Sequence, residues 1–484
     1  MSNPPSSELL QALERLLGPK GYSADPADLE PWLTDWRRRY RGKAAAMLSP
    51  ASTEEVAAIV RLCADAGVPI VPQGGNTSMV AGAIPGPEGD SLLLSMRRMN
   101  RIRSMSMETR QAVCEAGVVL ATLHEQADAV GLRFPLSLGA KGSATIGGLI
   151  STNAGGTQVL RFGTMRGLVL GIEAVLPDGN VFEGLAALRK DNRGYDLRQL
   201  LIGAEGTLGI VTAATLRLFP AVGSRSVAWI GLSSPEKALD LLRLLEASTG
   251  ESVESFELVP KSALDLVLAH LPGTRAPLER PYPWNVLVEA VSPVVAPSPE
   301  KDLSHALRAA LETELIEDAV IAASEAQAQA LWRLRDSISE GEQKDGPAAK
   351  HDISVQVADM PRFMTGAAAE VESKFPGTRV IAFGHLGDGN VHFNVRAPEG
   401  RGPEWLEEEA PALTAFVHDL VVAAGGSISA EHGIGQMRIT ELGRLGDPAR
   451  LSAMRAIKRA MDPKGIMNPG KLVPPEGEPA FRSS

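Results

Sequence analysis

The sequence predicts an α+β fold that is divided between more than one domain, and three observations lead to this prediction. The chain has 484 residues, whereas a single hydrophobic core rarely grows beyond about 250–300 residues. Short strand-like stretches and longer helix-like stretches both occur along the chain. The pattern also changes near residue 221, because residues 42–220 combine short apolar strands with glycine-rich loops and the later residues contain longer helical stretches.

Local patterns predict the individual elements in order. Residues 54–67 have the apolar spacing of a helix and finish at a glycine, which is typical of helix ends. Residues 68–75 predict a buried strand that runs into a loop, and residues 168–184 predict two strands around an Asp-Gly turn. The same criteria predict strands at 208–220 and 285–291, and helices at 235–248, 325–343, 405–426 and 448–465.

The composition argues against several classes of protein. A net charge of −10 argues against nucleic acid as a partner, because surfaces that bind nucleic acid are rich in lysine and arginine. No stretch of 18 apolar residues occurs and the first 30 residues lack the pattern of a signal peptide, so we expect no transmembrane segment. Only Cys63 and Cys114 are present, which is usual in a reducing compartment. These observations predict a cytoplasmic protein that handles small molecules.

Glycines are concentrated in one part of the chain. Nine of them lie between Gly139 and Gly171, among apolar, hydroxyl and amide side chains. Glycine allows sharp turns and close approach of the backbone to a ligand, so this stretch predicts a backbone wrapped around a large polar cofactor. An earlier loop, PQGGNTS at 72–78, has N–H groups suited to a diphosphate, although a plain turn after the strand explains that loop equally well.

Two histidines flank a predicted turn in FGHLGDGNVHFNV, residues 383–395. If Asp388 and Gly389 form the centre of a type I′ turn, counting outward places His385 directly opposite His392 on one face of a hairpin. Apolar neighbours indicate a buried hairpin, in which a shared metal ion satisfies both imidazoles. A polar pair on a solvent-exposed face is the alternative.

The segment AEHGIG supplies a carboxylate and a third histidine, Glu431 and His432. Two imidazoles and one carboxylate leave open coordination positions on a divalent ion, as catalytic metal sites do. The ligand types fit zinc, and they also fit manganese, iron or cobalt.

The chain resembles a known family of flavoenzymes. The loop PQGGNTS, the stretch from PLSLGAKG to FGTMRG, LPDGNVFEG and IGAEGTLGIVTAATLRLFP are similar to the FAD-binding, PCMH-type domain of vanillyl-alcohol-oxidase-type proteins. FGHLGDGNVHFNV, AEHGIG and MDPKGIMNPGKL are similar to the FAD-linked oxidase C-terminal domain. The resemblance covers about residues 30–473 and implies an FAD-dependent oxidoreductase.

The resemblance also implies a domain organisation. A helical segment at 1–41 precedes a two-subdomain FAD-binding domain with mixed sheets at 42–220. A larger α+β substrate domain at 221–412 contains an antiparallel sheet and the metal-binding hairpin. A helical segment at 413–484 then packs back toward the FAD-binding domain.

The resemblance implies that FAD lies on the glycine-rich loops, with its diphosphate on residues 72–77. No histidine occurs before His124, which argues against a histidyl link there and favours non-covalent FAD. The implied cofactor-binding residues are Pro72, Gln73, Gly74, Gly75, Asn76, Thr77, Gly142, Ser143, Thr145, Gly148, Asn153, Ala154, Glu205, Gly206, Ile210 and Asn468.

The resemblance further implies that His385, His392 and Glu431 bind Zn²⁺ or another divalent metal, and that His432 is the catalytic base. TDWRRRYRG, KDNRGYDLRQL and KHDISV are most similar to the branch of the family that oxidises D-2-hydroxyglutarate to 2-oxoglutarate. The implied substrate-binding residues are Arg335, Ser339, Lys350, Asn394 and His432. Ser339 stands where the family usually has threonine, and it keeps the hydroxyl group.

Other functions stay open at this point. A D-lactate or glycolate dehydrogenase of the same family is the nearest alternative, and a zinc hydrolase or a non-catalytic flavin- or metal-binding protein is more remote. The family implies electron-transferring flavoprotein or a quinone as the electron acceptor, and a homodimer as the assembly.

Overall fold

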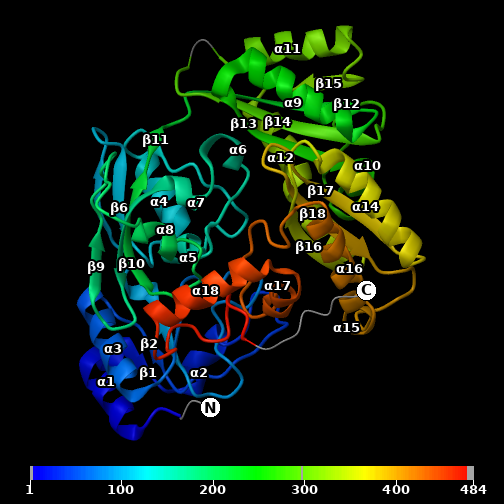
Figure 1. Cartoon of the computed structure of the whole chain (residues 1–484). Helices are drawn as coiled ribbons and strands as arrows, with labels where there is room; N and C mark the ends of the chain where they lie inside the picture. Colours follow the sequence, from blue (N-terminus) through cyan, green and yellow to red (C-terminus); the bar gives the residue numbers. More distant parts are fainter. Residues whose placement is uncertain (1–3, 296–297, 477–484) are drawn as a thin grey trace. The chain divides into compact units, whose positions relative to one another are not determined.

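A computed structural model describes residues 4–295 and 298–476, and the chain divides into two compact units (Figure 1). Unit 1 comprises Met1–Gly155, Gly163–Pro220 and Glu431–Ser484. Unit 2 comprises Gly156–Phe162 and Ala221–Ala430. Both units combine helices and sheets, which confirms the predicted α+β class. The four-segment division expected from the sequence stays a prediction.

Unit 1 contains a mixed sheet and an antiparallel sheet. The mixed sheet has the order β1 (Tyr22–Ser23), β2 (Met47–Leu48), β4 (Leu92–Ser95) and β3 (Ile70–Gln73), with β4 parallel to β2 and β3. The antiparallel sheet has the order β5 (Ile102–Ser106), β6 (Gln111–Glu115), β10 (Ile210–Arg217), β8 (Val169–Val175) and β9 (Val181–Gly184). A short pair joins β11 (Phe219–Pro220) to β7 (Leu132–Arg133).

The helices of unit 1 connect these strands. They are α1 (Ser7–Gly21), α2 (Pro26–Leu29), α3 (Thr53–Ala66), α4 (Leu120–Asp128), α5 (Ile146–Ser151), α7 (Met165–Leu168), α8 (Leu197–Leu201), α17 (Ile439–Leu445) and α18 (Pro448–Met461), with short 3-10 turns at Glu30–Trp32 and Met96–Arg98. The predicted helix at 54–67 is confirmed as α3. Ser52 caps its N-terminus and Gly67 ends it with φ 66°.

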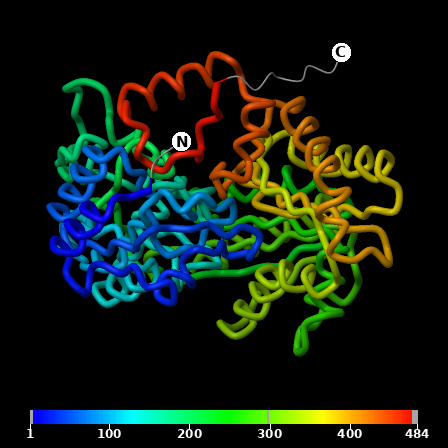
Figure 2. The backbone as a smooth tube through the Cα atoms, turned by 90° about the horizontal axis from the view of Figure 1, so that it is seen from below, coloured from blue at the N-terminus to red at the C-terminus, as the bar shows by residue number. Residues whose placement is uncertain are grey.

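The end of the chain returns to the first strands of unit 1. After α18, Met467 forms a parallel bridge with Ile70, and Asn468 N–H donates to the Ile70 carbonyl at 2.9 Å. Figure 2 shows this return, with the red C-terminal segment running back to blue N-terminal residues. Residues more than 390 positions apart in the sequence therefore share one core, as Ile70 and Met467 do.

Unit 2 is built on one antiparallel sheet of seven strands. Its order is β15 (Asp318–Ile321), β12 (Ser224–Leu232), β14 (Trp284–Ser292), β13 (Val253–Pro260), β17 (Arg379–His385), β18 (Asn390–Arg396) and β16 (Ala348–Ser354). The helices of unit 2 are α6 (Val159–Phe162), α9 (Pro235–Thr249), α10 (Lys261–His270), α11 (Glu300–Glu312), α12 (Glu325–Asp336), α13 (Ile338–Lys344), α14 (Met360–Lys374), α15 (Trp405–Glu408) and α16 (Ala410–Ala423), with a 3-10 turn at Gly250–Ser252.

Both faces of this sheet are covered by helices. Val286 and Val288 of β14 lie in the core formed with α9, α11, α14 and α16, where α9 and α11 pack side by side (Figure 1). Leu287, between them, lies in the core formed with α10, α12 and α13. The alternation follows from the two-residue period of a strand.

Two predicted helices are divided in the structure. The single helix expected at 325–343 is wrong, because α12 ends at Asp336 and α13 begins at Ile338, with Ser337 as the junction. The helix expected at 405–426 is divided between Glu408 and Ala410. Within residues 4–295 and 298–476, every helix falls short of the length and apolarity that crossing a membrane would require.

Candidate active site

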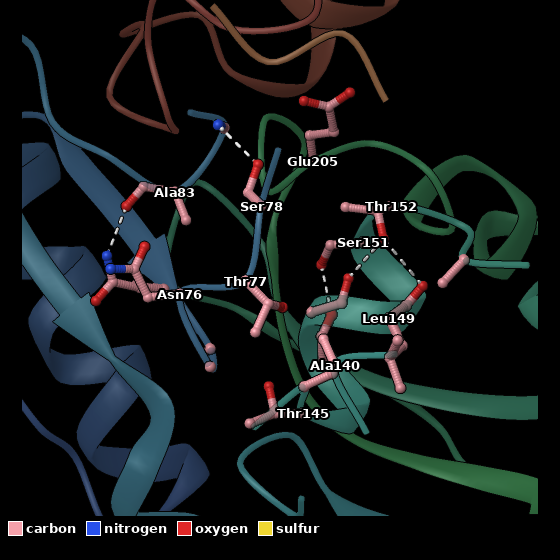
Figure 3. Close-up of a pocket in the computed structure, with 18 of the residues that line it drawn as sticks. Asn76, Thr77, Ser78, Ala83, Ala140, Thr145, Leu149, Ser151, Thr152 and Glu205 are labelled. Atoms are coloured by element: carbon pink, nitrogen blue, oxygen red, sulfur yellow. Dashed lines mark hydrogen bonds between the residues drawn. The ribbon is translucent and has the colours of Figure 1, made fainter. Parts of the chain in front are cut away.

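Unit 1 encloses a cavity of about 560 Å³ between its glycine-rich loops (Figure 3). Three segments supply most of the wall, namely residues 72–79, 138–155 and 205–211. Two side chains from the last part of the chain, Glu431 and His432, also line it. The volume and the mixed lining are those of a site for a cofactor or another organic ligand.

The loop after β3 approaches the second glycine-rich segment too closely for any side chain. A Cβ at Gly75 would lie 1.8 Å from the carbonyl oxygen of Ser143, and one at Gly74 would lie 2.2 Å from Oγ1 of Thr145. The N–H groups of residues 74–77 donate no hydrogen bond to any residue that the structure describes. Such a row of available N–H groups fits an anionic diphosphate.

One buried side chain of the cavity also lacks a partner. Among the described residues, none forms a hydrogen bond with Oγ1 of Thr145, although this residue is only 6% exposed. Buried hydroxyl groups are normally paired, so this atom fits contact with a bound polar ligand. The glycine cradle and the unpaired hydroxyl together fit the flavin dinucleotide that the sequence implies.

Most of the predicted cofactor-binding residues line this cavity. Asn153 and Asn468 do not. Asn153 accepts the Arg166 N–H at 2.9 Å, and Asn468 donates to the carbonyl oxygens of Gly82 and Glu205 at 3.0 and 2.7 Å. The members that do line it are Pro72, Gln73, Gly74, Gly75, Asn76, Thr77, Gly142, Ser143, Thr145, Gly148, Ala154, Glu205, Gly206 and Ile210.

Sequence reasoning missed other residues of the cavity wall. Trp36 lines the cavity from a distant segment, and its loop is joined to the diphosphate loop by the bond from Asn76 Nδ2 to the Thr34 carbonyl at 3.0 Å. The motif TDWRRRYRG marks this segment in the sequence, but nothing in it indicates a place beside residues 72–77. The other residues that lie outside the glycine-rich stretches predicted to hold the cofactor are Met79, Gly82, Ala83, Met96, Ala116, Gly209 and Val211. Further members of the wall fall within those predicted stretches, namely Ser78, Leu138, Gly139, Ala140, Ala144, Gly147, Leu149, Ser151, Thr152 and Gly155.

The histidine-bearing hairpin of unit 2 has a different register from the one predicted. His385 pairs with Asn390, and His392 pairs with Phe383, so the two histidines are not directly opposite each other. The loop between β17 and β18 holds four residues, and only Gly389 has a positive φ, at 80°. The type I′ turn centred on Asp388 and Gly389 is therefore wrong. The Asp388 carboxylate instead accepts the Asn390 N–H at 2.9 Å, an Asx-type turn.

The two imidazoles still lie beside each other. The observed register differs from the predicted one by two residues, and a shift of two keeps every side chain on its original face. His385 and His392 are diagonal neighbours with ring centroids 5.6 Å apart and ring planes at 76°. The predicted shared face is therefore present, although it results from a different turn.

A buried carboxylate orients one of these rings. Oε1 of Glu257 lies 2.6 Å from Nδ1 of His385, and its Oε2 accepts a hydrogen bond from Nε of Arg335 at 2.8 Å. Burial alone would raise the pKa of Glu257, but the charges of Arg335 and His385 outweigh it and lower that pKa to about 2. With Nδ1 donating to Glu257, a neutral His385 carries its lone pair on Nε2, the nitrogen that binds the metal in carboxylate–histidine–metal sites. Nη2 of Arg335 lies 3.4 Å from this nitrogen.

The same sheet face carries Lys350 and Asn394 as a directly opposed pair. Asn394 Nδ2 donates to Oε2 of Glu342 at 2.8 Å, and Nζ of Lys350 lies 3.3 Å from the same oxygen. Glu342 is fully buried, and its Oε1 has no partner among the described residues. The carboxylate of Glu342 therefore contacts two of the five predicted substrate-binding side chains.

Two more of the five predicted substrate-binding residues, Arg335 and Ser339, lie on consecutive helices. Arg335 is in α12, and Nη2 of its guanidinium lies 3.4 Å from Nε2 of His385. Ser339 is in α13 and is exposed. Both residues lie within the single helix expected at 325–343, which the structure divides at Ser337.

Glu431 and His432 follow directly on a residue fixed in unit 2. The Ala430 N–H donates to the Asp352 carbonyl at 3.2 Å, and Asp352 is paired with His392 in the sheet. Consecutive Cα atoms are about 3.8 Å apart. Ala430, the residue just before Glu431, is therefore hydrogen-bonded to strand β16.

Three acidic residues of the unit 2 site were missed in the sequence, namely Glu257, Glu342 and Asp352. Each is at least 98% buried. A carboxylate within an apolar strand, as in SFELV for Glu257, is the only signal for the first of them. Their hydrogen-bond partners lie in other elements, as His385 does for Glu257 and Asn390 does for Asp352, so only the folded chain shows what these carboxylates do.

Comparisons with known proteins agree with the cavity and the hairpin. Residues 44–184 match the family "FAD binding domain", and residues 223–472 match the family "FAD linked oxidases, C-terminal domain". A solved structure of p-cresol methylhydroxylase with substrate bound has the same fold, with a TM-score of 0.72 over 96% of each chain and 16% sequence identity. These matches define an FAD-dependent oxidoreductase.

Several relatives match along almost the whole chain. D-2-hydroxyglutarate dehydrogenase of Bos taurus is 39% identical over 97% of this chain and 84% of its own, and that of Xanthomonas citri pv. viticola is 36% identical over 98% and 97%. A putative D-lactate dehydrogenase of Schizosaccharomyces pombe is 34% identical over 97% and 90%. The chain belongs to the FAD-linked oxidase family, with the fold of vanillyl-alcohol-oxidase-type flavoenzymes.

The close packing at Gly75 gives a prediction about flavin binding. Gly75→Ala places a Cβ 1.8 Å from the Ser143 carbonyl and forces the two glycine-rich loops apart. We expect the purified variant to hold less than a tenth of the wild-type FAD, measured from the ratio of flavin to protein absorbance. Gly142→Ala is the matched control, because a Cβ there meets no protein atom within 4 Å, and its thermal stability should equal that of the wild type. Full flavin content in Gly75→Ala would contradict the cradle described here.

Proposed function

We propose that this protein oxidises D-2-hydroxyglutarate to 2-oxoglutarate with FAD and a divalent metal. The observation that carries the proposal is the row of side chains on one face of β16 and β18. Asp352 and His392 form one opposed pair, and Lys350 and Asn394 form the next opposed pair on the same face. A metal-ligating imidazole and a cationic side chain are therefore successive neighbours in the sheet.

The proposed metal ligands are His385, His392 and Glu431. The bond between Glu257 and His385 supports this assignment, because it presents the second ring nitrogen as a ligand. The anchoring of Ala430 beside His392 supports Glu431 as the third ligand. When bound, a divalent metal acts as a Lewis acid that lowers the pKa of a coordinated hydroxyl group. Zinc fits two nitrogen ligands and one oxygen ligand.

FAD in this proposal is bound without a covalent link. When bound, it accepts a hydride equivalent from the carbon that carries the substrate hydroxyl. Cys63 and Cys114 are buried, and neither lines the cavity of unit 1. Among the described residues, His432 is the one histidine that lines the cavity, and the proposal gives it the role of base instead.

The proposed base, His432, follows a proposed metal ligand and lines the cavity of unit 1. An imidazole titrates near neutral pH and can take the hydroxyl proton of a 2-hydroxy acid. His432 is adjacent to Glu431 in the sequence, which supports this role, because the proton to be removed lies on the substrate hydroxyl group that the metal would polarise.

Lys350 is the proposed contact of the second substrate carboxylate, together with Arg335, Ser339 and Asn394. Two residues along a strand correspond to about 6.8 Å, so the Lys350–Asn394 pair is displaced by that length from the pair that contains His392. A 2-hydroxy diacid has its second carboxylate at the far end of a short carbon chain, whereas lactate has none. The protein carries a net charge of −10, so a dianionic substrate needs local cations such as these.

D-lactate is the second candidate substrate. The name of the Schizosaccharomyces pombe relative supports it, and the contact between Lys350 and Glu342 shows that the lysine already has a counter-charge without a diacid. Glycolate belongs to the same alternative.

The remaining proposals concern partners and location. We keep electron-transferring flavoprotein or a quinone as the proposed acceptor and a homodimer as the proposed assembly. The cytoplasmic location stays a prediction, because the name of the Bos taurus relative places that protein in mitochondria while the name of the Xanthomonas citri relative gives no compartment.

Anaerobic flavin reduction tests the proposed substrate. D-2-hydroxyglutarate should bleach the flavin absorbance of metal-replete protein within seconds, because the hydride has no other acceptor. D-lactate, glycolate and L-2-hydroxyglutarate serve as the comparison panel and should act at least tenfold more slowly. Faster bleaching by D-lactate would replace the diacid assignment with the second candidate.

Lys350→Ala should separate diacids from monoacids. Loss of the ammonium group should raise the KM for D-2-hydroxyglutarate at least tenfold and change the KM for D-lactate by less than threefold, measured with an artificial dye acceptor. Lys344→Ala is the matched control, since Lys344 is exposed and pairs with Glu340 on the surface of α13. Equal small effects on both substrates would remove Lys350 from the substrate site.

Removal of divalent metal should abolish turnover while FAD stays bound, because His385 and His392 belong to unit 2 and the loop at residues 72–77 contains none of the proposed ligands. Dialysis against a chelator followed by assay and by flavin absorbance measures both properties. Activity should return on addition of Zn²⁺, Mn²⁺ or Co²⁺. Full activity in metal-free protein would refute the metal-assisted mechanism.

A further inference from the structure

Both oxygens of the Glu205 carboxylate accept hydrogen bonds from the backbone of a segment that is distant in the sequence. Its Oε1 accepts the Ile434 N–H and its Oε2 accepts the Gly435 N–H, each at 2.8 Å and each buried. A Cβ at Gly433 would lie 2.7 Å from Oε1, so the carboxylate packs directly against backbone there. Hydrogen bonds from backbone N–H groups to an ionised carboxylate are stronger than those between neutral groups.

Glu205 is itself fixed on three sides. Its backbone has φ 50°, its N–H donates to the Ser151 carbonyl at 2.8 Å, and its carbonyl accepts from Asn468 Nδ2 at 2.7 Å. Ser151 belongs to α5, which lines the cavity of unit 1. The side chain therefore joins the cavity wall to the segment that follows His432.

We propose that Glu205 is a positioning residue that fixes residues 431–435, and through them the placement of Glu431 and His432 in the cavity wall. The inference rests on the function proposed above for these two side chains. Ile434 and Gly435 are held on Glu205 within unit 1. Only Gly433 lies between His432 and the first of these attachments, so the backbone that carries His432 has little freedom relative to the cavity wall.

The contacts also distinguish this role from the one expected from the family resemblance. That resemblance places Glu205 among the groups that touch the cofactor, whereas both of its carboxylate oxygens face Ile434 and Gly435. Burial raises the pKa of Glu205, and the hydrogen bonds from the two N–H groups oppose that rise. The Glu205 carboxylate thus interacts with the backbone N–H groups of Ile434 and Gly435.

Glu205→Gln tests the proposal in the intact holoenzyme. The amide keeps an oxygen for one N–H but turns its own NH₂ toward the other, so the segment should loosen. We expect the rate of anaerobic flavin reduction by D-2-hydroxyglutarate to fall at least tenfold, because small displacements of a catalytic group have large effects on rate. FAD content and the rate of flavin reoxidation by a dye acceptor should stay within twofold of the wild type.

Hydrogen–deuterium exchange of the peptide that spans Ile434 and Gly435 is the second measurement, and it does not depend on turnover. These two amides should exchange at least tenfold faster in Glu205→Gln. Glu173→Gln is the matched control. Glu173 is a largely buried glutamate of unit 1, hydrogen-bonded to Thr53, Thr212 and Arg103 and absent from the cavity wall, and this variant should keep both the wild-type rate and the wild-type exchange.

The outcomes separate this proposal from the proposed function. Loss of FAD from Glu205→Gln would show a cofactor-binding role and overturn the inference, and so would unchanged exchange at Ile434 and Gly435. Faster exchange with an unchanged rate of flavin reduction would also overturn it. Wild-type protein whose flavin is not reduced by D-2-hydroxyglutarate would refute the proposed substrate. In that case, hydrogen–deuterium exchange would still test whether Glu205 holds Ile434 and Gly435. The rate of flavin reduction would then be measured with any 2-hydroxy acid that does reduce the flavin.

Discussion

The two-residue period of the β-strand is the constraint on which the unit 2 site depends. It places Asp352, Lys350, His392 and Asn394 on one face of β16 and β18, while the alternate residues fill an apolar core. A one-residue change of register would move this whole polar row into the opposite core, which has no partners for it. The buried glutamates Glu257 and Glu342 complete the arrangement, because each supplies a counter-charge that the cationic or imidazole side chains need away from water.

In unit 1, the site depends on glycines, which carry no side chain and allow two loops to approach each other closely. Gly74 and Gly75 allow the loop after β3 to touch the segment around Ser143, and the N–H groups of that loop remain available to a ligand. The cavity wall combines these glycines with apolar, hydroxyl and amide side chains (Figure 3). The same unit ends with residues 431–476, so a segment from the far end of the chain contributes the ionisable side chains Glu431 and His432 to this wall.

Local patterns predicted helices and strands well where the apolar spacing matched the period of the element and a glycine marked its end. Helix α3 ends at Gly67 as expected, and strands β8 and β9 flank the turn that contains Gly179. The hairpin between His385 and His392 shows the limit. Asp388-Gly389 favours a two-residue turn, but the Asp388 carboxylate bonds to the Asn390 N–H, and the Asn390 side chain is held by Asp352 and Ile353 of a neighbouring strand. These contacts hold the first residue of β18 on β16, directly after a four-residue loop that local preference did not predict.

The sequence by itself determined the α+β class, the glycine-rich loops, the family, and the types of residue available for chemistry, because each of these follows from composition, spacing or short motifs. Tertiary structure alone decided which carboxylates serve the site. Glu257 and Glu342 match no motif in the sequence, and Glu205 lies in a motif that implied contact with the cofactor. Only the fold shows that their partners are His385, Lys350 and Ile434. A buried charge is stable only beside a compensating donor or cation, and the folded chain is what brings these pairs together.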